Sequence, residues 1–258
     1  MKPHKLPALL ALATTFLAFA ASAADTRLYE MRTYYAAPGK FEAMNARFRQ
    51  VTCRLFEKHG MVNLGYWTPL EEKDGAGTKL VYLLAHPSKE AKDKAWKAFM
   101  ADPDWQAAYK ASEVNGKLVE KMEVQFLQAT DYSPALQPAG GMSPRVFELR
   151  TYTAAPGRLG ALNARFRDHT LKLFAKHGIT NIGYWTPAPG EPGADSTLAY
   201  LVAHASREAA AASFDKFRAD PAWLEARKNS EEKAGGSLTA ADGVKSVFLR
   251  PLDYSPLQ

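Results

Sequence analysis

The sequence predicts an α+β protein made of two tandem ferredoxin-like units that form a dimeric α/β barrel within one chain. Three observations predict it. A long segment of the chain recurs once, each copy has the order β-α-β-β-α-β, and a short segment rich in Pro, Gly and Ala separates the copies.

The repeat is extensive. Between residues 28–69 and 146–187, 26 of 42 positions are identical at a shift of 118. The closing Asp131-Tyr-Ser-Pro134 returns as Asp253-Tyr-Ser-Pro256 at a shift of 122, so the second copy gained four residues before its last strand. These limits give one domain at residues 24–134, a linker at 135–144 and a second domain at 145–258.

The elements of the first copy follow from residue patterns. Alternation, helical spacing and Gly or Pro breaks predict, in order, a strand at Leu28–Tyr35, a helix from Ala37-Pro38-Gly39 to His59-Gly60, strands at Met61–Thr68 and Lys79–His86, a helix capped by Ser88 and broken at Asp102-Pro103, and a strand at Val119–Thr130. Helices on one side leave the other face of such a sheet bare. We therefore expect the two copies to pack sheet to sheet, and further association between chains stays open.

Residues 1–23 have the features of a cleavable secretory signal. Lys2 and Lys5 precede an apolar run, and Ala21-Ser22-Ala23 offers small residues for cleavage after Ala23. An uncleaved membrane anchor is the alternative, but the run is short for a spanning helix. We expect a periplasmic or secreted protein without stable membrane insertion after cleavage.

Composition restricts the function classes. The net charge of +6 is small, and basic residues alternate with acidic ones, which argues against a nucleic-acid partner. The single cysteine, Cys53, aligns with Leu171 and is expected to pack, and it excludes Cys-clustered metal sites. The sequence contains neither a phosphate loop nor a nucleophile elbow. The sequence supports neither haem nor a metal, so any cofactor is unknown.

Several motifs resemble those of the NIPSNAP family. They are Glu30-Met-Arg-Thr-Tyr34 followed by Ala-Pro-Gly, the Lys-His-Gly helix end, Gly-Tyr-Trp-Thr, and Asp-Pro-Trp, and both copies carry all of them. The resemblance implies a dimeric α/β barrel. That superfamily includes cofactor-free monooxygenases, haem-degrading enzymes and dye-decolourising peroxidases. It implies oxygenation or isomerisation of a planar substrate, but the family offers no agreed catalytic residues.

One face of the first strand carries the candidate catalytic residues. Glu30, Arg32 and Tyr34 share a face, and Glu148, Arg150 and Tyr152 repeat them. We expect this face to point into the barrel, where Arg would bind an anion and Glu would act as acid or base. The alternative is a structural ion pair. His86 and His204 end the third strand of each copy and are expected at the barrel rim, as further catalytic candidates or as ordinary strand-end histidines.

The second and third strands provide candidate ligand-binding residues. The expected cavity lining is Asn63, Trp67 and Tyr82 with their copies Asn181, Trp185 and Tyr200, and the alternative role for the tryptophans is core packing. Two further sets are expected to be structural. His59 and His177 should cap helix carbonyls, and Arg47, Arg49, Arg165 and Arg167 should be solvated.

Two functions are compatible with these sequence patterns. The first is an exported protein that binds a small molecule in the barrel cavity, with a cofactor-light enzymatic activity as its extension. The second is a non-catalytic scaffold whose barrel is filled by Trp, Tyr and Leu side chains. The change of Glu123 and Gln125 to Lys245 and Val247 indicates that the two halves differ.

Overall fold

The computed structural model describes residues 25–136 and 145–258. The predicted signal segment and most of the predicted linker lie outside the described residues. The first half contains β1 (Leu28–Ala36), α1 (Phe41–Arg47), the π-helical segment η1 (Phe48–Thr52), α2 (Cys53–Lys58), β2 (Val62–Pro69), the 3-10 turn η2 (Glu72–Asp74), β3 (Lys79–His86), α3 (Lys89–Ala101), α4 (Pro103–Ser112) and β4 (Val119–Ala129). The second half contains β5 (Val146–Ala154), α5 (Leu159–Arg165), η3 (Phe166–Thr170), α6 (Leu171–Lys176), β6 (Thr180–Pro187), β7 (Thr197–His204), α7 (Arg207–Ala219), α8 (Pro221–Lys233) and β8 (Thr239–Pro251).

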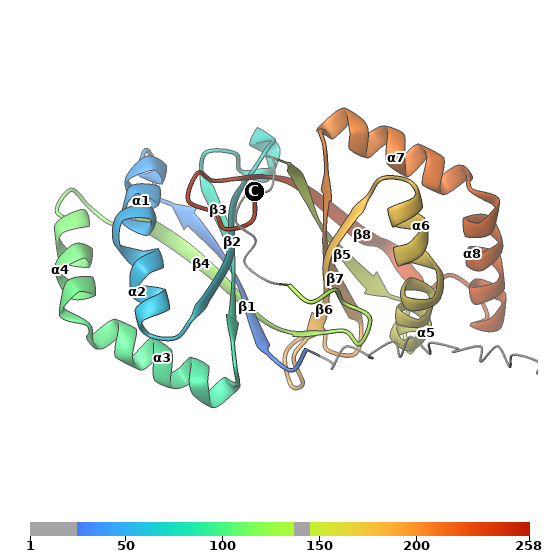
Figure 1. Ribbon diagram of the computed structural model, residues 1–258, viewed down its shortest axis with the longest axis horizontal. Helices are drawn as coiled ribbons and strands as arrows, with labels where there is room; N and C mark the ends of the chain where they lie inside the picture. The colour runs from blue at the N-terminus through green and yellow to red at the C-terminus, as the bar shows by residue number, and fades with distance from the viewer. Residues whose placement is uncertain (1–24, 137–144) are drawn as a thin grey trace, which may run out of the picture.

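The strands form one closed barrel in the order β1-β3-β2-β8-β5-β7-β6-β4. Within each half, long antiparallel ladders join the four strands. Between halves, β2 pairs with β8 and β4 pairs with β6 through three residue pairs each. The helices of the two halves lie on opposite outer sides of the barrel (Figure 1). The predicted fold class is therefore confirmed, down to the pairing of the two copies within one chain.

The barrel interior is filled with apolar side chains from both halves. Trp67 packs on Phe147, and Tyr29 packs on Trp185, each with ring centroids 5.6 Å apart. Leu257, beyond the last strand, is only 2% exposed and belongs to the same cluster. We call this cluster, which also contains Leu83, the barrel core. Its contents are those expected of the filled barrel.

The predicted orientation of β1 is wrong. Tyr29 belongs to the barrel core, whereas Glu30, Arg32 and Tyr34 face the helices outside the barrel, where Tyr34 contacts Phe48 of η1. The same holds for Glu148, Arg150 and Tyr152 in the second half. The reason is that both faces of the strand are covered, one by the opposite sheet and one by helices. Alternation separates these two faces but does not tell which covering each one receives.

A bulge in β2 changes a second prediction. The register shifts between Asn63 and Gly65, so Asn63 points toward α2 while Trp67 lies in the barrel core. The two residues therefore do not share a face. Gly65 makes this possible, because a Cβ there would lie 2.1 Å from the Trp67 ring. Asn181, Gly183 and Trp185 repeat the arrangement.

The repeated Asp-Tyr-Ser-Pro motif connects the halves. Tyr254 donates a hydrogen bond to Asn45 of α1, and Asp253 pairs with Arg49, whose exposed side chain the sequence did not predict to be paired. Ser255 accepts a hydrogen bond from the Tyr66 amide of β2. The first copy of the motif makes the same contacts on the second half: Tyr132 with Asn163, Asp131 with Arg167, and Ser133 with Tyr184. Each half therefore ends on the other half.

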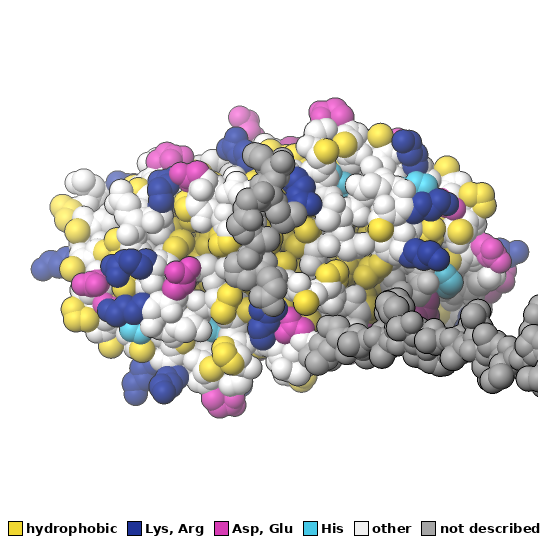
Figure 2. Space-filling view, viewed as in Figure 1, with side chains coloured by type: hydrophobic (Ala, Val, Ile, Leu, Met, Phe, Trp, Pro, Cys, Tyr) yellow, Lys and Arg dark blue, Asp and Glu magenta, His cyan; other side chains and the backbone are white. Residues whose placement is uncertain are grey.

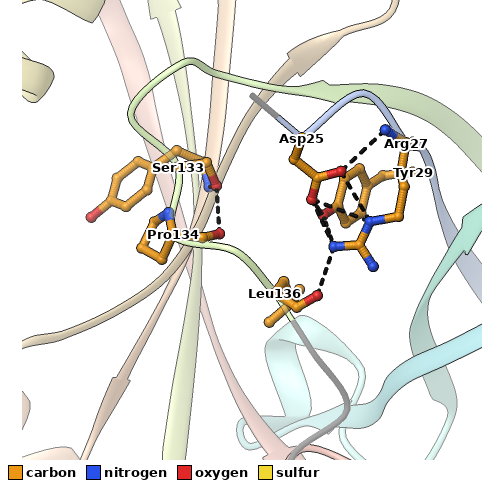
Figure 3. Close-up of polar contacts among 7 residues, drawn as sticks. Asp25, Arg27, Tyr29, Ser133, Pro134 and Leu136 are labelled. Carbon is orange, nitrogen blue, oxygen red and sulfur yellow. Dashed lines mark hydrogen bonds and ion pairs between the residues drawn. The ribbon is translucent and has the colours of Figure 1, made fainter. Parts of the chain in front are cut away.

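A polar cluster anchors the start of β1. The Arg27 guanidinium lies between the Asp25 carboxylate, the Tyr29 hydroxyl and the Leu136 carbonyl, at 2.6, 2.8 and 2.7 Å (Figure 3). Its hydrogen bond holds the pKa of Asp25 down at about 2. The cluster ties the segment that follows β4 to the first strand.

The surface matches the composition. Acidic and basic side chains are interspersed over the visible face of both halves (Figure 2). Within residues 25–136 and 145–258, the helices are too short or too polar to cross a bilayer.

Candidate functional site

Glu30 is the centre of a buried polar cluster between β1, β3 and α3. It is 0% exposed, and its carboxylate accepts hydrogen bonds from Arg32 Nε at 2.7 Å and Trp96 Nε1 at 2.8 Å. His86 Nε2 lies 2.8 Å from the same carboxylate. Burial raises the pKa of Glu30, but the bonds from His86, Arg32 and Trp96 outweigh it and leave the pKa below its ordinary value. Glu30 is therefore an ionised, fully partnered carboxylate.

The second half builds the same cluster with a different donor. Glu148 pairs with Arg150 at 2.6 Å, and His204 Nε2 lies 3.2 Å away. The counterpart of Trp96 is Phe214, which has no donor. Ser246 on β8 donates to Glu148 instead. The pairing of β4 and β8 with the first strand of each half puts Val124 at the matching position.

A cavity of about 560 Å³ lies between the sheet and the helices of the first half. We call it the first cavity. Its walls are rich in aromatic side chains and carry two arginines. Its lining residues are Arg32, Tyr34, Arg47, Phe48, Thr52, Phe56, Trp96, Phe99, Met100, Trp105, Tyr109, Glu113, Lys117, Val119, Glu120, Lys121 and Met122.

The predicted catalytic residues divide at this cavity. Arg32 and Tyr34 line it, and Arg32 Nη1 donates to the Tyr34 hydroxyl at 3.1 Å. The Arg32 guanidinium also lies 3.9 Å from the centre of the Trp96 ring. Glu30 and His86 are fully buried behind this wall and do not line the cavity. Glu30 therefore holds the Arg32 guanidinium through an ion pair, and His86 in turn contacts the Glu30 carboxylate.

Arg47 is a lining residue that the sequence prediction missed. It is 7% exposed rather than solvated, and its guanidinium donates to Ser112 at 3.0 Å and pairs with Glu113 at 3.3 Å. Its Nε has no hydrogen-bond partner among the described residues. One signal could have found it, because Arg47 falls on the apolar stripe of the helix between Met44 and Phe48.

A π-helical segment shapes the same wall. Phe48 begins η1, Thr52 ends it, and both line the first cavity. The Thr52 hydroxyl donates to the Arg47 carbonyl at 3.2 Å and so links the two ends of the wider turn. Such segments are rare and are frequent at functional sites.

The predicted ligand-binding residues lie elsewhere. Asn63 donates to the Cys53 carbonyl at 2.9 Å, and Tyr82 stacks on Tyr66 in the packed layer between sheet and helices. Trp67 belongs to the barrel core. The second-half copies Asn181, Trp185 and Tyr200 occupy the matching places. Because none of the six lines either aromatic cavity, their binding role stays a prediction without support from the cavity geometry.

The Lys-His-Gly and Asp-Pro-Trp motifs meet in space. Lys58 Nζ and His59 Nε2 both lie 2.7 Å from the Asp102 carboxylate, which also caps the start of α4. His59 therefore binds a carboxylate rather than helix carbonyls. His177 and Asp220 repeat the contact. The hydrogen bond from Lys58, with those from His59 and the Asp104 amide, holds the pKa of Asp102 well below its usual range.

Cys53 and the acidic residues give no further site. Burial raises the pKa of the Cys53 thiol to about 11, which fits the predicted packing role. Within the described parts of the chain, His, Cys, Asp and Glu side chains do not converge in groups of three that could hold a metal.

The second half has a smaller counterpart, which we call the second cavity. Its volume is about 240 Å³. Four matching aromatic positions keep the same residue type, as Phe166, Phe174, Phe217 and Trp223. At two other positions, Arg218 and Arg227 stand where the first half has Met100 and Tyr109. A third hollow of about 640 Å³ lies between α5 and α8 and is lined by alanines and by polar and charged residues, without Phe, Tyr or Trp.

Solved structures share the barrel across most of the chain. A proposed monooxygenase from Lactobacillus acidophilus NCFM has 13% identity and a TM-score of 0.53, over 88% of this chain and 94% of that one. An anthrone oxidase-like protein has 12% identity and a TM-score of 0.54, over 92% and 96%. At this identity the likeness shows the fold alone.

Single NIPSNAP units match one half. A NIPSNAP-like domain protein from Burkholderia xenovorans has 19% identity and a TM-score of 0.38, over 43% of this chain and 92% of that one. No curated protein matches the chain significantly. The NIPSNAP family model matches twice, at residues 29–134 and 147–256. The chain belongs to the NIPSNAP family and consists of two tandem NIPSNAP domains.

Proposed function

We propose that the first cavity binds a planar aromatic molecule that carries an anionic group. The observation that carries this proposal is the combination of a ligand-sized space, aromatic walls and the incompletely paired Arg47. About 560 Å³ lies within the roughly 300–1,000 Å³ that small-molecule sites occupy. This space replaces the barrel cavity expected from the sequence, because the barrel core fills the interior.

The shape of the walls favours a flat ligand. Trp96, Phe99 and Trp105 follow one another along the helical side, and the Phe99 and Trp105 ring centroids are 4.5 Å apart. Aromatic faces stack well on flat rings. The outer lining residues Met100, Tyr109 and Met122 are 56, 45 and 58% exposed, so the ligand meets apolar surface as it enters.

Charge favours an anion. Arg32 is already neutralised by Glu30 at 2.6 Å, whereas Glu113 is 3.3 Å from Arg47 and leaves its Nε free of a partner among the described residues. A carboxylate on the ligand would supply that acceptor with a charge-assisted hydrogen bond. Arg47 is therefore the residue that we assign to the anionic group.

Binding can be tested with a matched ligand pair. Anthraquinone-2-carboxylate and its carboxamide have nearly the same shape, but only the carboxylate is charged. We expect both ligands to quench tryptophan fluorescence, because Trp96 and Trp105 line the cavity. The carboxylate should do so at a lower concentration, because it also binds Arg47. Arg47→Gln should weaken carboxylate binding roughly tenfold and leave the carboxamide unchanged, while Arg165→Gln, the matched change in the second half, should affect neither.

Two results would contradict the proposal. The first is equal affinity for the two ligands, and the second is equal loss from Arg47→Gln and Arg165→Gln. A further variant, Met100→Arg with Tyr109→Arg, removes the apolar entrance of the first cavity and should weaken binding of the uncharged carboxamide. Liquid chromatography with mass spectrometry of the ligand after incubation in air tests the reactions that the superfamily implies: oxygenation raises the mass, and isomerisation changes the retention time at unchanged mass.

The alternative scaffold function predicts no small-molecule binding at all. The filled barrel fits that alternative, but the cavity outside the barrel favours a ligand. We further propose that binding takes place in the periplasm or outside the cell, because residues 1–23 have the features of a signal. Amino-terminal sequencing of the native protein should begin at Ala24, and an intact Met1 would contradict export by cleavage.

A further inference from the structure

We propose that the second cavity is a separate binding site for a small oxyanion, such as a phosphate or an aliphatic carboxylate. The proposal does not depend on the ligand of the first cavity. It rests on the residues by which the two halves differ and on two buried guanidinium groups of the second half that lack full pairing.

The second cavity is small. The second cavity measures about 240 Å³, against about 560 Å³ for the first. It falls below the usual range for drug-sized ligands, so a multi-ring molecule does not fit. A tetrahedral or carboxylate anion with a few heavy atoms does.

The lining of the second cavity is rich in arginine. Four arginines line the second cavity, namely Arg150, Arg165, Arg218 and Arg227, with Glu231 as the single acidic lining residue. Glu231 is shared, because Arg165 Nη1 lies 3.4 Å and Arg227 Nε 3.2 Å from the same carboxylate oxygen. In the first half, Tyr109 replaces the second arginine, so the matching carboxylate pairs with Arg47 alone. Arg150 pairs with Glu148 and Arg218 pairs with Asp215, so the four arginines face three carboxylates and one positive charge is in excess.

Two of these arginines, Arg150 and Arg165, are incompletely paired. Arg165 is 6% exposed and the Arg150 side chain is 16% exposed, and the Nε atom of each has no hydrogen-bond partner among the described residues. Arg150 binds Glu148 through Nη1, whereas Arg32 in the first half uses Nε for the same contact. Burial lowers the pKa of Arg165 by more than the nearby Glu231 carboxylate raises it. Buried donors without acceptors are rare unless a ligand or water supplies one.

The surroundings of the two guanidiniums are fixed. Arg165 lies over the Trp223 ring at 5.2 Å, and Arg150 lies over the Phe214 ring at 4.7 Å. Stacked arginines keep their planar donor edge available, and that edge matches two oxygens of a phosphate or carboxylate. Arg218 and Arg227, whose side chains are 60 and 57% exposed, stand at the entrance and would attract anions.

The test is titration of the protein, expressed as the full chain, with inorganic phosphate and separately with acetate. Calorimetry at constant ionic strength measures affinity, and the Nε–H signals of arginine in nitrogen-15 NMR report which guanidiniums respond. We expect at least one of the two anions to bind and to shift the Arg165 and Arg150 signals. The tighter of the two identifies the chemistry as phosphate or carboxylate.

Three variants separate the site from general charge effects. Arg165→Gln should weaken binding at least about tenfold, and the exposed Arg227→Gln should weaken it roughly threefold even if Arg165→Gln fails to fold. Arg54→Gln, a change at a 61% exposed arginine of α2 that lines neither cavity, should leave anion affinity unchanged. Absence of binding by both anions, or equal loss in Arg54→Gln and Arg165→Gln, would overturn the proposal. Neither result bears on the aromatic ligand, which is measured by tryptophan quenching.

Discussion

Replacement of Glu30 by Gln is the sharpest test of the buried cluster. Gln keeps the volume but removes the charge opposite Arg32, and it places an amide donor among the donors of Trp96 and His86. Because Glu30 is 0% exposed, water cannot replace the lost acceptor. Breaking a buried ion pair by removing one partner costs about 3 kcal/mol. We therefore expect Glu30→Gln to destabilise the fold rather than to remove a catalytic group.

The assay is urea unfolding followed by tryptophan fluorescence, together with calorimetry. A loss of about 3 kcal/mol should lower the melting temperature by roughly 6–12 °C in a chain of this size. The matched change Glu148→Gln in the second half should have a similar effect. Glu123→Gln is the control, because the Glu123 and Lys121 side chains are 52 and 62% exposed and such pairs contribute at most about 1 kcal/mol.

The effect should depend on pH with a defined sign. The pKa of Glu30 is lowered on folding, so its contribution is complete above about pH 4.5, the ordinary value, and is lost as the pH falls through the lowered value. The difference between wild type and Glu30→Gln should therefore shrink in acid. Equal unfolding midpoints at neutral pH, or a difference that grows on acidification, would refute the buried ionic cluster.

Two further predictions concern the hydrogen-bond donors to Glu30 and the packing of the barrel core. Trp96→Phe should lower the free energy of unfolding by about 1–3 kcal/mol, because Glu30 loses a donor. Adding Val124→Ser should recover part of that loss, because Ser246 donates to Glu148 in the half that has Phe214 in place of Trp96; urea midpoints that fall additively would contradict this compensation. Leu257→Ala should cost about 2–4 kcal/mol because its 2% exposed side chain fills the barrel core, whereas the 52% exposed Leu224→Ala should cost less than about 0.5 kcal/mol; equal calorimetric stability of the two variants would show that the tail is not part of the core.

The fold was predictable because the chain contains the same β-α-β-β-α-β pattern twice. Two units with one bare sheet face each must cover those faces, and the shared Asp-Tyr-Ser-Pro motif ends both copies. What the motif does could not be predicted. Asp131 and Asp253 pair with arginines of the other half, and such long-range contacts leave no local pattern.

The site was harder to predict than the fold. Tyr29 is 1% exposed and Glu30 is 0% exposed, so adjacent residues are equally buried and polarity misassigned the faces. Partners from α3 and β3 make the helix-facing side suitable for charge. The bulge in β2 was signalled, because a glycine inside a strand often marks one. Arg47 was misjudged because most helix arginines are solvated, although its place on the apolar stripe was visible.

The places where the two halves diverge argue that duplication served the cavities. The barrel core keeps the same tryptophan in both halves, at Trp67 and Trp185, and the same leucine, at Leu127 and Leu249. The exchanges Met100 to Arg218 and Tyr109 to Arg227 fall instead on cavity walls. Two identical subunits would have to carry identical cavities, since one sequence encodes both. Fusion removes that constraint while the shared core keeps the barrel closed, so one cavity can keep an apolar entrance while the entrance of the other acquires arginines.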